Sequence, residues 1–342
     1  MSKRPFRLPV EGRSFLEVGS LGRSGPSGDR LSPAQIEQIR RTVRRTPEVM
    51  VKVTGGGTKA GAVTAHFAYI SRKGKLEIET DEGERIAGRD AQRGYLAGWH
   101  LELSTGQYRG PHDQRKEARQ TKLVHHIVLS MPAPTPPEKV LAAARTFARE
   151  KFAAQHRYAM VLHTDQAHPH VHVVVKAEGE YGKRLHISKP MLREWRDDFA
   201  RMMREQGIAA NATPRVVRGR NKGKARDRIF RAQRRRASSA MGAKVMTVAT
   251  ELAKNGQFRE PAARAKLLES RKAVVANWTK IAETLDRQEE VVLAGDVRYF
   301  AKHLPAVRTD MEGLAAKFTR HLAASRADRR RLEPRDREPP TR

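Results

Sequence analysis

The chain lacks cysteine entirely. That absence excludes disulfide bonds, thiolate metal sites and a cysteine nucleophile, and it is compatible with a reducing cytoplasm, the compartment we expect. Long apolar runs are also missing. No segment is long enough to span a bilayer, and no continuous apolar core follows the basic N-terminus. We therefore expect neither membrane insertion nor a signal peptide.

Acidic residues are scarce relative to basic ones. The 342 residues include 68 Lys and Arg against 38 Asp and Glu, a formal net charge of +30. Such an excess indicates a polyanionic partner. We prefer nucleic acid to an anionic membrane, because the basic segments lack the interleaved aromatic residues of an interfacial anchor. With 38% hydrophobic and 31% charged residues, a globular domain with basic extensions is expected.

Short β-branched runs and longer helical patterns indicate a mixed α+β domain. Strands are predicted at 49–53, 123–130, 158–163, 169–176 and 185–188, and helices at 60–71, 137–154 and 190–207. Strands and helices do not alternate strictly, and close neighbours such as 158–163 and 169–176 imply antiparallel pairing. The predicted fold is a central antiparallel sheet with flanking helices.

Composition divides the chain into five segments. Residues 1–48 are predicted to be a mobile basic arm with one short helix capped at Ser32, and residues 49–210 the globular domain. An Arg/Lys-rich linker at 211–240, a helical module at 241–325 and a disordered charged tail at 326–342 follow.

The linker carries the strongest charge cluster of the chain. Eleven basic residues and the single acid Asp227 lie between positions 215 and 236. Such a run forms either a solvated linker or helix face, or a surface that neutralises DNA phosphates independently of sequence. The candidate DNA contacts here are Arg215, Arg218, Arg220, Lys222 and Lys224.

Residues 163–172 hold four of the thirteen histidines, in the order His163-Thr-Asp-Gln-Ala-His-Pro-His-Val-His172. Side chains two apart on a strand share a face, so His170 and His172 are expected to point together while Val171 and Val173 point the other way. His163 ends the preceding strand and can supply a third imidazole. Three imidazoles on one face suit a divalent cation, and they leave coordination positions open for substrate.

Other readings of these residues stay open. A histidine beside a strand can be a hydrogen-bonded core residue, and Asp165 can be a turn residue that bonds its own backbone. The shared face and the apolar frame favour a metal site, in which Asp165 orients a ligand imidazole. His168 is out of phase with the ligand pair and precedes Pro169, so we place it in the loop.

A nucleic acid partner and a metal site together suggest phosphoryl transfer, which needs a nucleophile. Water would make a simple nuclease, and a tyrosine would make a covalent enzyme. Among six tyrosines, Tyr69 stands out because Arg72, Lys73 and Lys75 follow it and can hold phosphate.

The helical phase of Tyr69 is also informative. At ~100° per residue, Val63, Phe67 and Ile70 form one apolar stripe, and Tyr69 falls roughly 120° from its centre. Tyr69 therefore need not be a core aromatic, although it can still pack on the flank of the helix.

Four motifs occur in a recognisable order. They are Gly55-Gly-Gly-Thr-Lys59, Tyr69-Ile-Ser-Arg-Lys-Gly-Lys-Leu-Glu77, His126-Ile-Val-Leu-Ser130-Met-Pro and His163-x-Asp165-x-x-x-x-His170-x-His172. This order resembles the relaxases of the HUH endonuclease superfamily, most of all the P-type mobilisation class with its MobA/VirD-type nuclease domains. The resemblance spans residues 49–210.

The resemblance implies a metal-dependent DNA relaxase. Such an enzyme nicks one strand of single-stranded or extruded DNA at a transfer origin, stays linked to the 5′ end for conjugative mobilisation, and later rejoins the strand. Tyr69 matches the attacking tyrosine, Asp165 the acid that supports a histidine and helps to activate the tyrosine, and Ser130 a serine that contacts DNA. The metal-binding histidines are matched by His163, His170 and His172.

The resemblance further implies Mg²⁺ or Mn²⁺ as cofactor, with Zn²⁺, Ni²⁺ or Co²⁺ as substitutes, and accessory relaxosome and coupling or secretion proteins as partners. Lys176 stands where close relatives commonly have asparagine, so a polar site contact is either replaced by a cation or absent. His126 matches a family histidine, but a structural role is as well supported, and it stays outside the predicted site. Two other functions remain open: another HUH nuclease (a replication initiator or transposase), or a non-catalytic DNA-binding protein.

Overall fold

The computed structural model describes residues 9–10, 13–14, 30–107, 121–219, 239–258 and 261–332. They form two compact units, one spanning Arg7–Thr213 and one made mainly of Pro214–Arg342.

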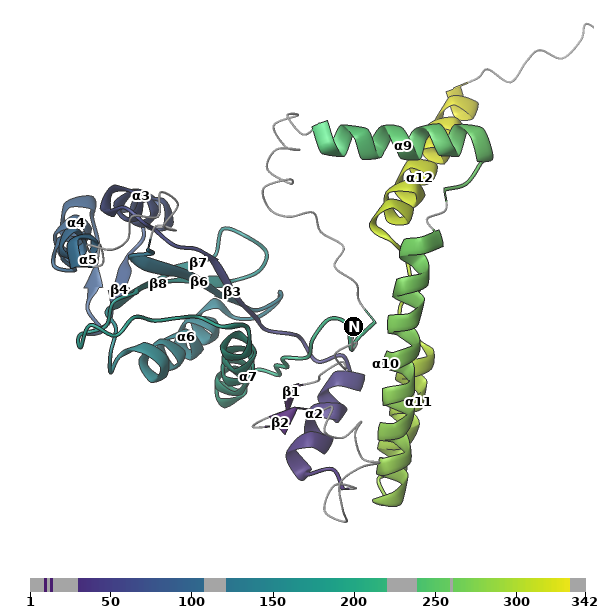
Figure 1. Cartoon of the computed structure of the whole chain (residues 1–342), viewed down its shortest axis with the longest axis horizontal. Helices are drawn as coiled ribbons and strands as arrows, with labels where there is room; N and C mark the ends of the chain where they lie inside the picture. The colour runs from purple at the N-terminus through teal and green to yellow at the C-terminus, as the bar shows by residue number, and fades with distance from the viewer. Residues whose placement is uncertain are drawn as a thin grey trace, which may run out of the picture. The chain divides into compact units, whose positions relative to one another are not determined.

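The N-terminal unit is built on a six-stranded antiparallel sheet with the strand order β3-β6-β8-β7-β4-β5 (Figure 1). The strands are β3 (Met50–Gly55), β4 (Ile78–Thr80), β5 (Arg85–Ile86), β6 (Val124–Ser130), β7 (Tyr158–His163) and β8 (His170–Lys176). A separate ribbon pairs β1 (Pro9–Val10) with β2 (Arg13–Ser14). The sheet with its flanking helices confirms the predicted α+β class.

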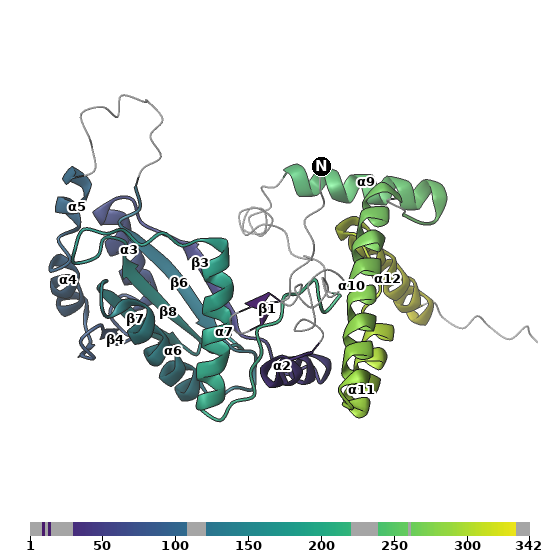
Figure 2. The same ribbon diagram turned by 60° about the horizontal axis from the view of Figure 1, so that its bottom comes forward.

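Helices cover both faces of the sheet (Figures 1 and 2). On one face lie α3 (Ala60–Ile70), α4 (Arg89–Ala97) and α5 (Leu101–Gln107), and on the other α6 (Pro137–Phe152) and α7 (Lys189–Glu205). The β8 side chains alternate between the two cores: Val171 and Val173 pack with α6 and α7, and Val174 packs with α3. Burying each valine stabilises the fold by roughly 1.5–3 kcal/mol, which fixes the faces of the strand.

Helix α2 (Pro33–Val43) begins at the predicted cap. The Ser32 side chain accepts from Gln35 N at 3.3 Å, and Gln35 Oε1 accepts from Ser32 N at 2.7 Å, a capping box that satisfies two free N–H groups. The helix buries Ile39 almost completely. Thr42 at its end accepts a hydrogen bond from Asn211 Nδ2 at 3.1 Å, so α2 is joined to the last residues of the unit.

The strand predicted at 185–188 is wrong. Residues Leu185–Ser188 lie in an irregular segment that meets the end of β8 through one hydrogen bond, from Leu185 N to the Ala177 carbonyl, and one isolated bridge between Glu178 and Arg184. Ser188 instead caps α7, since its side chain accepts from Met191 N. The competing capping chemistry explains the error.

The C-terminal unit consists of α9 (Ser239–Asn255), α10 (Pro261–Arg287), α11 (Val291–Lys302) and α12 (Asp310–Leu332). Helices α10 and α11 lie side by side (Figures 1 and 2), and Trp278 and Phe300 meet edge to face at 5.2 Å. Helix α12 extends to Leu332, into the tail predicted to be disordered from 326, because its Ala, Arg and Leu residues favour helix. No helix among the described residues could cross a bilayer by length and hydropathy.

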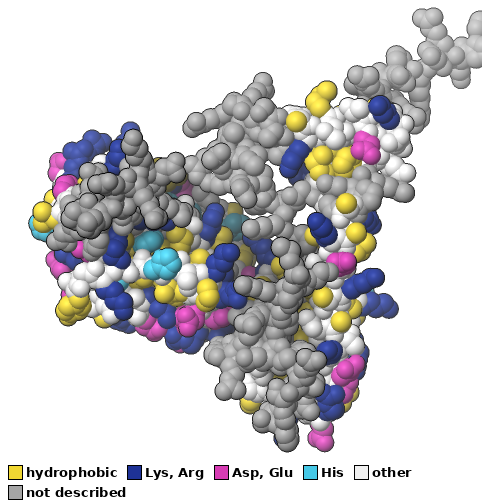
Figure 3. Space-filling view, viewed as in Figure 1, with side chains coloured by type: hydrophobic (Ala, Val, Ile, Leu, Met, Phe, Trp, Pro, Cys, Tyr) yellow, Lys and Arg dark blue, Asp and Glu magenta, His cyan; other side chains and the backbone are white. Residues whose placement is uncertain are grey.

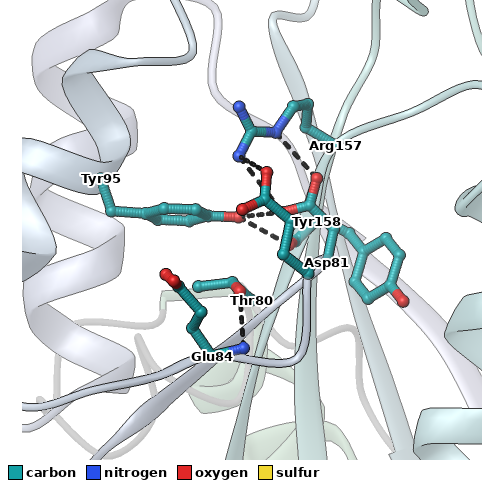
Figure 4. A network of polar contacts seen from close by, with 7 residues as sticks. Thr80, Asp81, Glu84, Tyr95, Arg157 and Tyr158 are labelled. Atoms are coloured by element: carbon teal, nitrogen blue, oxygen red, sulfur yellow. Dashed lines mark hydrogen bonds and ion pairs between the residues drawn. The ribbon is translucent and has the colours of Figure 1, made fainter.

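A polar network joins the β4–β5 hairpin to β7 and α4 (Figure 4). The Tyr95 hydroxyl donates to Asp81 Oδ1 at 2.5 Å and lies 3.0 Å from the Tyr158 carbonyl. Arg157 donates to Asp81 Oδ2 at 2.8 Å and stacks over the Tyr95 ring at 5.5 Å. Burial is the main cause that raises the pKa of Tyr95, and the neighbouring Asp81 carboxylate raises it further. The network holds the far edge of the sheet in place.

We expect Tyr95→Phe to lower the free energy of unfolding by about 1–3 kcal/mol, because Asp81 and the Tyr158 carbonyl lose a buried donor. Urea unfolding followed by tryptophan fluorescence measures the loss. Tyr181→Phe is the matched control, since Tyr181 is 85% exposed. Equal stability of the two variants would contradict the proposed role of the network.

Stability is also expected to fall in mild acid. His125 on β6 is buried, with Nε2 3.0 Å from the Leu185 carbonyl oxygen, and burial lowers the pKa of His125 from 6.5 to about 4. As the pH falls, the unfolded chain binds a proton at His125 before the folded chain does. The contribution of neutral His125 to the free energy of unfolding is therefore complete above pH 6.5 and is lost as the pH falls toward 4. At pH 5 the loss is on the order of 2 kcal/mol. We expect the free energy of unfolding, measured with urea at pH 7 and pH 5, to decrease less for His125→Gln than for the wild type. Equal decreases would refute this role of His125.

Candidate metal centre and nucleophile

Three histidines meet at the ends of two neighbouring strands. His163 ends β7 and lies directly opposite His170, the first residue of β8, in antiparallel register. His172 follows two residues later on the same face. Ligand nitrogens from the three rings lie within 4.8 Å of one another. Strand pairing thus brings together the three imidazoles predicted as metal ligands.

Backbone carbonyls orient two of these rings. His163 Nε2 lies 2.6 Å from the Ile70 carbonyl oxygen, and His170 Nδ1 lies 3.0 Å from the His168 carbonyl oxygen. In each pair the imidazole N–H donates, which leaves the lone pair on the opposite ring nitrogen. Histidines that bind metals commonly have this arrangement, because the outer hydrogen bond fixes the tautomer and the ring orientation.

The protonation state of the cluster also suits a metal. Burial is the main cause that lowers the pKa of His163. Burial and the neighbouring histidine rings together lower the pKa of His172 to about 3. These rings are therefore neutral near pH 7, the form that coordinates an ion. Three imidazoles that leave coordination positions open fit a divalent cation.

Tyr69 lies in the last turn of α3 and is 63% exposed. Val63, Phe67 and Ile70 are buried in the core beneath the helix. Tyr69 thus lies off the apolar stripe of the helix, in line with its helical phase. The Tyr69 side chain is accessible to a ligand at the surface.

The chain turns sharply where α3 ends. Arg72 and Lys73 have positive φ angles of 53° and 60°, and Gly74 has a φ of 88°. A Cβ at Gly74 would come within 2.6 Å of the Arg89 backbone nitrogen, so this position requires glycine. The turn brings Arg72 back toward the end of β7.

Arg72 connects the tyrosine to the histidine cluster. Its Nη1 donates to the Tyr69 carbonyl at 3.0 Å, and its Cζ lies 5.4 Å from the Tyr69 ring centroid. Its Nη2 donates to Asp165 and lies 3.3 Å from His163 Nδ1. One guanidinium therefore contacts the candidate nucleophile, the candidate acid and a candidate metal ligand.

The Arg72 hydrogen bond lowers the pKa of Asp165, and the same bond raises the pKa of Arg72. Both side chains are substantially exposed, so this ion pair orders the site more than it stabilises the fold. Arg72 Nη2 also occupies the space beside His163 Nδ1. An ion that binds that nitrogen requires the guanidinium to move away from it.

Two histidines that were not part of the predicted site border the cluster. His66 on α3 and His126 on β6 stack face to face, with ring centroids 3.5 Å apart and an interplanar angle of 10°. The His66 ring lies 6.2 Å from Tyr69 and 6.4 Å from His172. Burial lowers the pKa of both stacked rings, that of His126 to about 3. The spacing of His66 and Tyr69, three residues apart on one helix, was the available sequence signal.

Ser130 and His168 hold the loop before β8. Ser130 is buried, and its hydroxyl donates to the Pro169 carbonyl at 3.0 Å. His168 Nδ1 accepts from Ala133 N at 3.1 Å, which fits its predicted place in the loop. A DNA contact by Ser130 stays a prediction, and its burial here favours a structural role.

The predicted basic contacts are divided between the two units. Lys73 and Lys75 are exposed near Tyr69, and in the C-terminal unit Arg215 is exposed while Arg218 is partly buried. The remaining candidates, Arg220, Lys222 and Lys224, lie outside the described residues. Figure 3 shows histidine side chains at the surface of the N-terminal unit with lysine and arginine side chains beside them.

Lys176 lies at the opposite end of β8 from His170 and pairs with Val124. Lys176 lies six positions along the strand from His170, a distance of roughly 20 Å. The substitution of lysine for the family asparagine is therefore remote from the three imidazoles.

Comparison with known proteins matches residues 102–208 to the family model of the relaxase, MobA/VirD2-like, nuclease domain. The T-DNA border endonuclease VirD2 of Rhizobium rhizogenes is 32% identical over 184 residues, which is 50% of this chain and 42% of that protein. The VirD2 protein of Agrobacterium fabrum (strain C58) is 33% identical over 184 residues, 50% of this chain and 41% of that protein. The match thus spans less than half of the length of these relatives.

A solved structure from work on the molecular basis of vancomycin resistance transfer in Staphylococcus aureus aligns with 49% of this chain and 98% of its own, at 12% identity and a TM-score of 0.33. Residues 102–208, the part matched by the family model, include β6, β7, β8 and all three clustered histidines. This part of the chain is similar to the MobA/VirD2-like relaxase nuclease domain.

Proposed function

We propose that this protein is a DNA relaxase that nicks one strand at a transfer origin or border sequence through attack by Tyr69. The observation that carries the proposal is the position of Arg72, whose guanidinium lies against the Tyr69 ring and donates to Asp165 beside the three clustered imidazoles. A phosphate bound in front of Arg72 would lie between the exposed phenol and the imidazoles. VirD2 relatives named as T-DNA border endonucleases support the same reaction class.

The proposed step is a transesterification. The Tyr69 oxygen forms a bond to phosphorus while the bond from phosphorus to the 3′ oxygen breaks, leaving a 3′ hydroxyl and a 5′ phosphotyrosine. The phenol proton passes to a nearby base, for which Asp165 is the candidate. One phosphoester replaces another, so the reverse attack by the 3′ hydroxyl can rejoin the strand without ATP.

The residues have distinct roles in this reaction. His163, His170 and His172 would hold a divalent metal, which when bound supplies Lewis-acid polarisation of a non-bridging phosphate oxygen. We propose Mg²⁺ or Mn²⁺, with Zn²⁺, Ni²⁺ or Co²⁺ as substitutes that imidazole ligands accept. Arg72 stabilises negative charge on the phosphate beside Tyr69.

Electrostatics would bring the DNA to this site. Exposed Lys73 and Lys75 follow Tyr69 directly, and Arg215 begins the basic run of the chain. The net charge of +30 favours binding to the phosphate backbone, with an affinity that decreases as salt increases. We further propose that accessory and coupling proteins of a transfer system act with this chain on its DNA.

The first test is the nucleophile. The assay contains Mn²⁺ and a single-stranded origin or border oligonucleotide, labelled on the fragment whose 5′ phosphate would join Tyr69. Wild type should form a covalent adduct on a denaturing gel. Tyr69→Phe should form none, because phenylalanine has no attacking oxygen. Tyr299→Phe is the control, since Tyr299 is 67% exposed and Tyr69 63%. A free 5′ phosphate formed equally well by the Tyr69 variant would contradict the proposal.

The second test is the metal site. His170→Ala removes one of three ligands and should weaken Mn²⁺ binding in calorimetry by more than about tenfold, with loss of the DNA adduct. His186→Ala, at an exposed position outside the cluster, should bind Mn²⁺ as wild type does. Adduct formation in excess EDTA would refute the proposed metal dependence, and DNA binding without cleavage under any metal would indicate a non-catalytic protein.

A further inference from the structure

We infer that His66 is a positioning residue for the metal ligand His172. In this arrangement His172 binds the ion through Nε2, and its Nδ1–H is held by His66 Nε2 through one bridging water. The inference rests on the proposed metal site.

The three ligand histidines differ in their outer hydrogen bonds. His163 and His170 each have a backbone carbonyl as partner, at 2.6 and 3.0 Å. The Nδ1 atom of His172 is buried and has no hydrogen-bond partner among the described residues. A metal-bound imidazole commonly donates its second N–H, because this hydrogen bond fixes the ring and increases its basicity. One ligand of the set therefore lacks the group that would orient it.

His66 lies where that group is needed. Its ring centroid is 6.4 Å from that of His172, and the two planes meet at 69°. Ring centroids this far apart place the ring nitrogens beyond direct hydrogen-bond distance, so one bridging water would have to join them. His66 Nε2 is also buried, and no group in the described part of the chain bonds to it, so both ends of the proposed bridge lack another partner there.

His126 explains why the His66 ring stays in place. The two rings stack at 3.5 Å with an angle of 10°, and His126 is carried by β6, whose residue Val128 lies opposite His172 in the sheet. Stacking restricts rotation of the His66 ring without using its nitrogens. His126 thus fixes the ring through its face, and its own Nε2 is buried with no hydrogen-bond partner among the residues described.

A second metal ion does not account for these nitrogens. Among the described residues, the ligand atoms of His163, His170 and His172 form a group within 4.8 Å of one another. Neither His66 nor His126 belongs to such a group. The stacked pair is better placed to support the ligand set than to form another one.

Cobalt binding to the full chain tests this inference. Co²⁺ affinity and its visible d–d absorption are measured for wild type, His66→Phe and His66→Gln. His66→Phe keeps a flat ring on His126 but loses both nitrogens, so we expect Co²⁺ to bind about 10–100-fold more weakly with an altered absorption band. His66→Gln retains an amide that can hold the water, and we expect it to restore affinity to within a few-fold of wild type. His186→Phe, at an exposed position, is the control.

The outcomes separate this inference from the proposed function. Wild type that binds no Co²⁺ would overturn the metal site itself. Wild-type affinity and spectrum in His66→Phe would overturn only the role of His66, and so would equal losses in His66→Phe and His66→Gln. If His66→Phe fails to fold, long-range ¹H–¹⁵N NMR of the Zn²⁺-loaded wild type decides the question: the inference requires Nε2 of His172 on the metal and a proton on Nδ1, and the reverse assignment overturns it.

Discussion

The alternation of side chains along β8 is the constraint on which the site depends. Val171 and Val173 are completely buried against α6 and α7, so His170 and His172 must point to the opposite face. A shift of one residue would turn the imidazoles into the apolar core under α6 and α7 and move the valines to the α3 side. Hydrophobic packing on one face therefore holds the candidate metal ligands on the other, and pairing with β7 brings His163 opposite His170.

The end of α3 depends on the same sheet. Ile70 anchors the helix in the core, and its carbonyl oxygen receives the hydrogen bond of His163. The turn that follows returns Arg72 to His163 and Asp165. The helix that carries Tyr69 and the strand that carries the candidate metal ligand His163 are thus joined by short polar contacts. This gives the exposed phenol a defined position beside the cluster although the tyrosine itself contributes nothing to the core.

Periodicity accounts for what could be predicted. The apolar stripe of α3 indicated that Tyr69 need not be a core aromatic, and the period-two pattern of β8 indicated that its histidines would share a face. Both signals are local, because burial selects every second residue of a strand and every third or fourth residue of a helix. The β4–β5 hairpin escaped prediction, since strands of three and two residues are too short to establish a period.

The misassigned strand also has a local cause. The Leu185–Ser188 segment has the residues of a strand, but Ser188 satisfies the first turn of α7 and the segment never joins a ladder. Ser130, whose DNA contact stays a prediction, likewise donates its hydroxyl proton to the Pro169 carbonyl. In each case a single hydrogen bond selected between alternatives that the residue type left open.

The sequence by itself determined the α+β class, the faces of β8, the phase of α3 and the basic character that points to DNA, because each follows from neighbours along the chain or from composition. Only the tertiary structure decided that Arg72 meets Asp165, 93 residues away, and that His66 stacks on His126 beside His172. Those contacts join different elements, and their geometry is set by how the helices pack on the sheet. Hydrophobic burial is non-directional and leaves no local pattern that specifies which polar groups will meet.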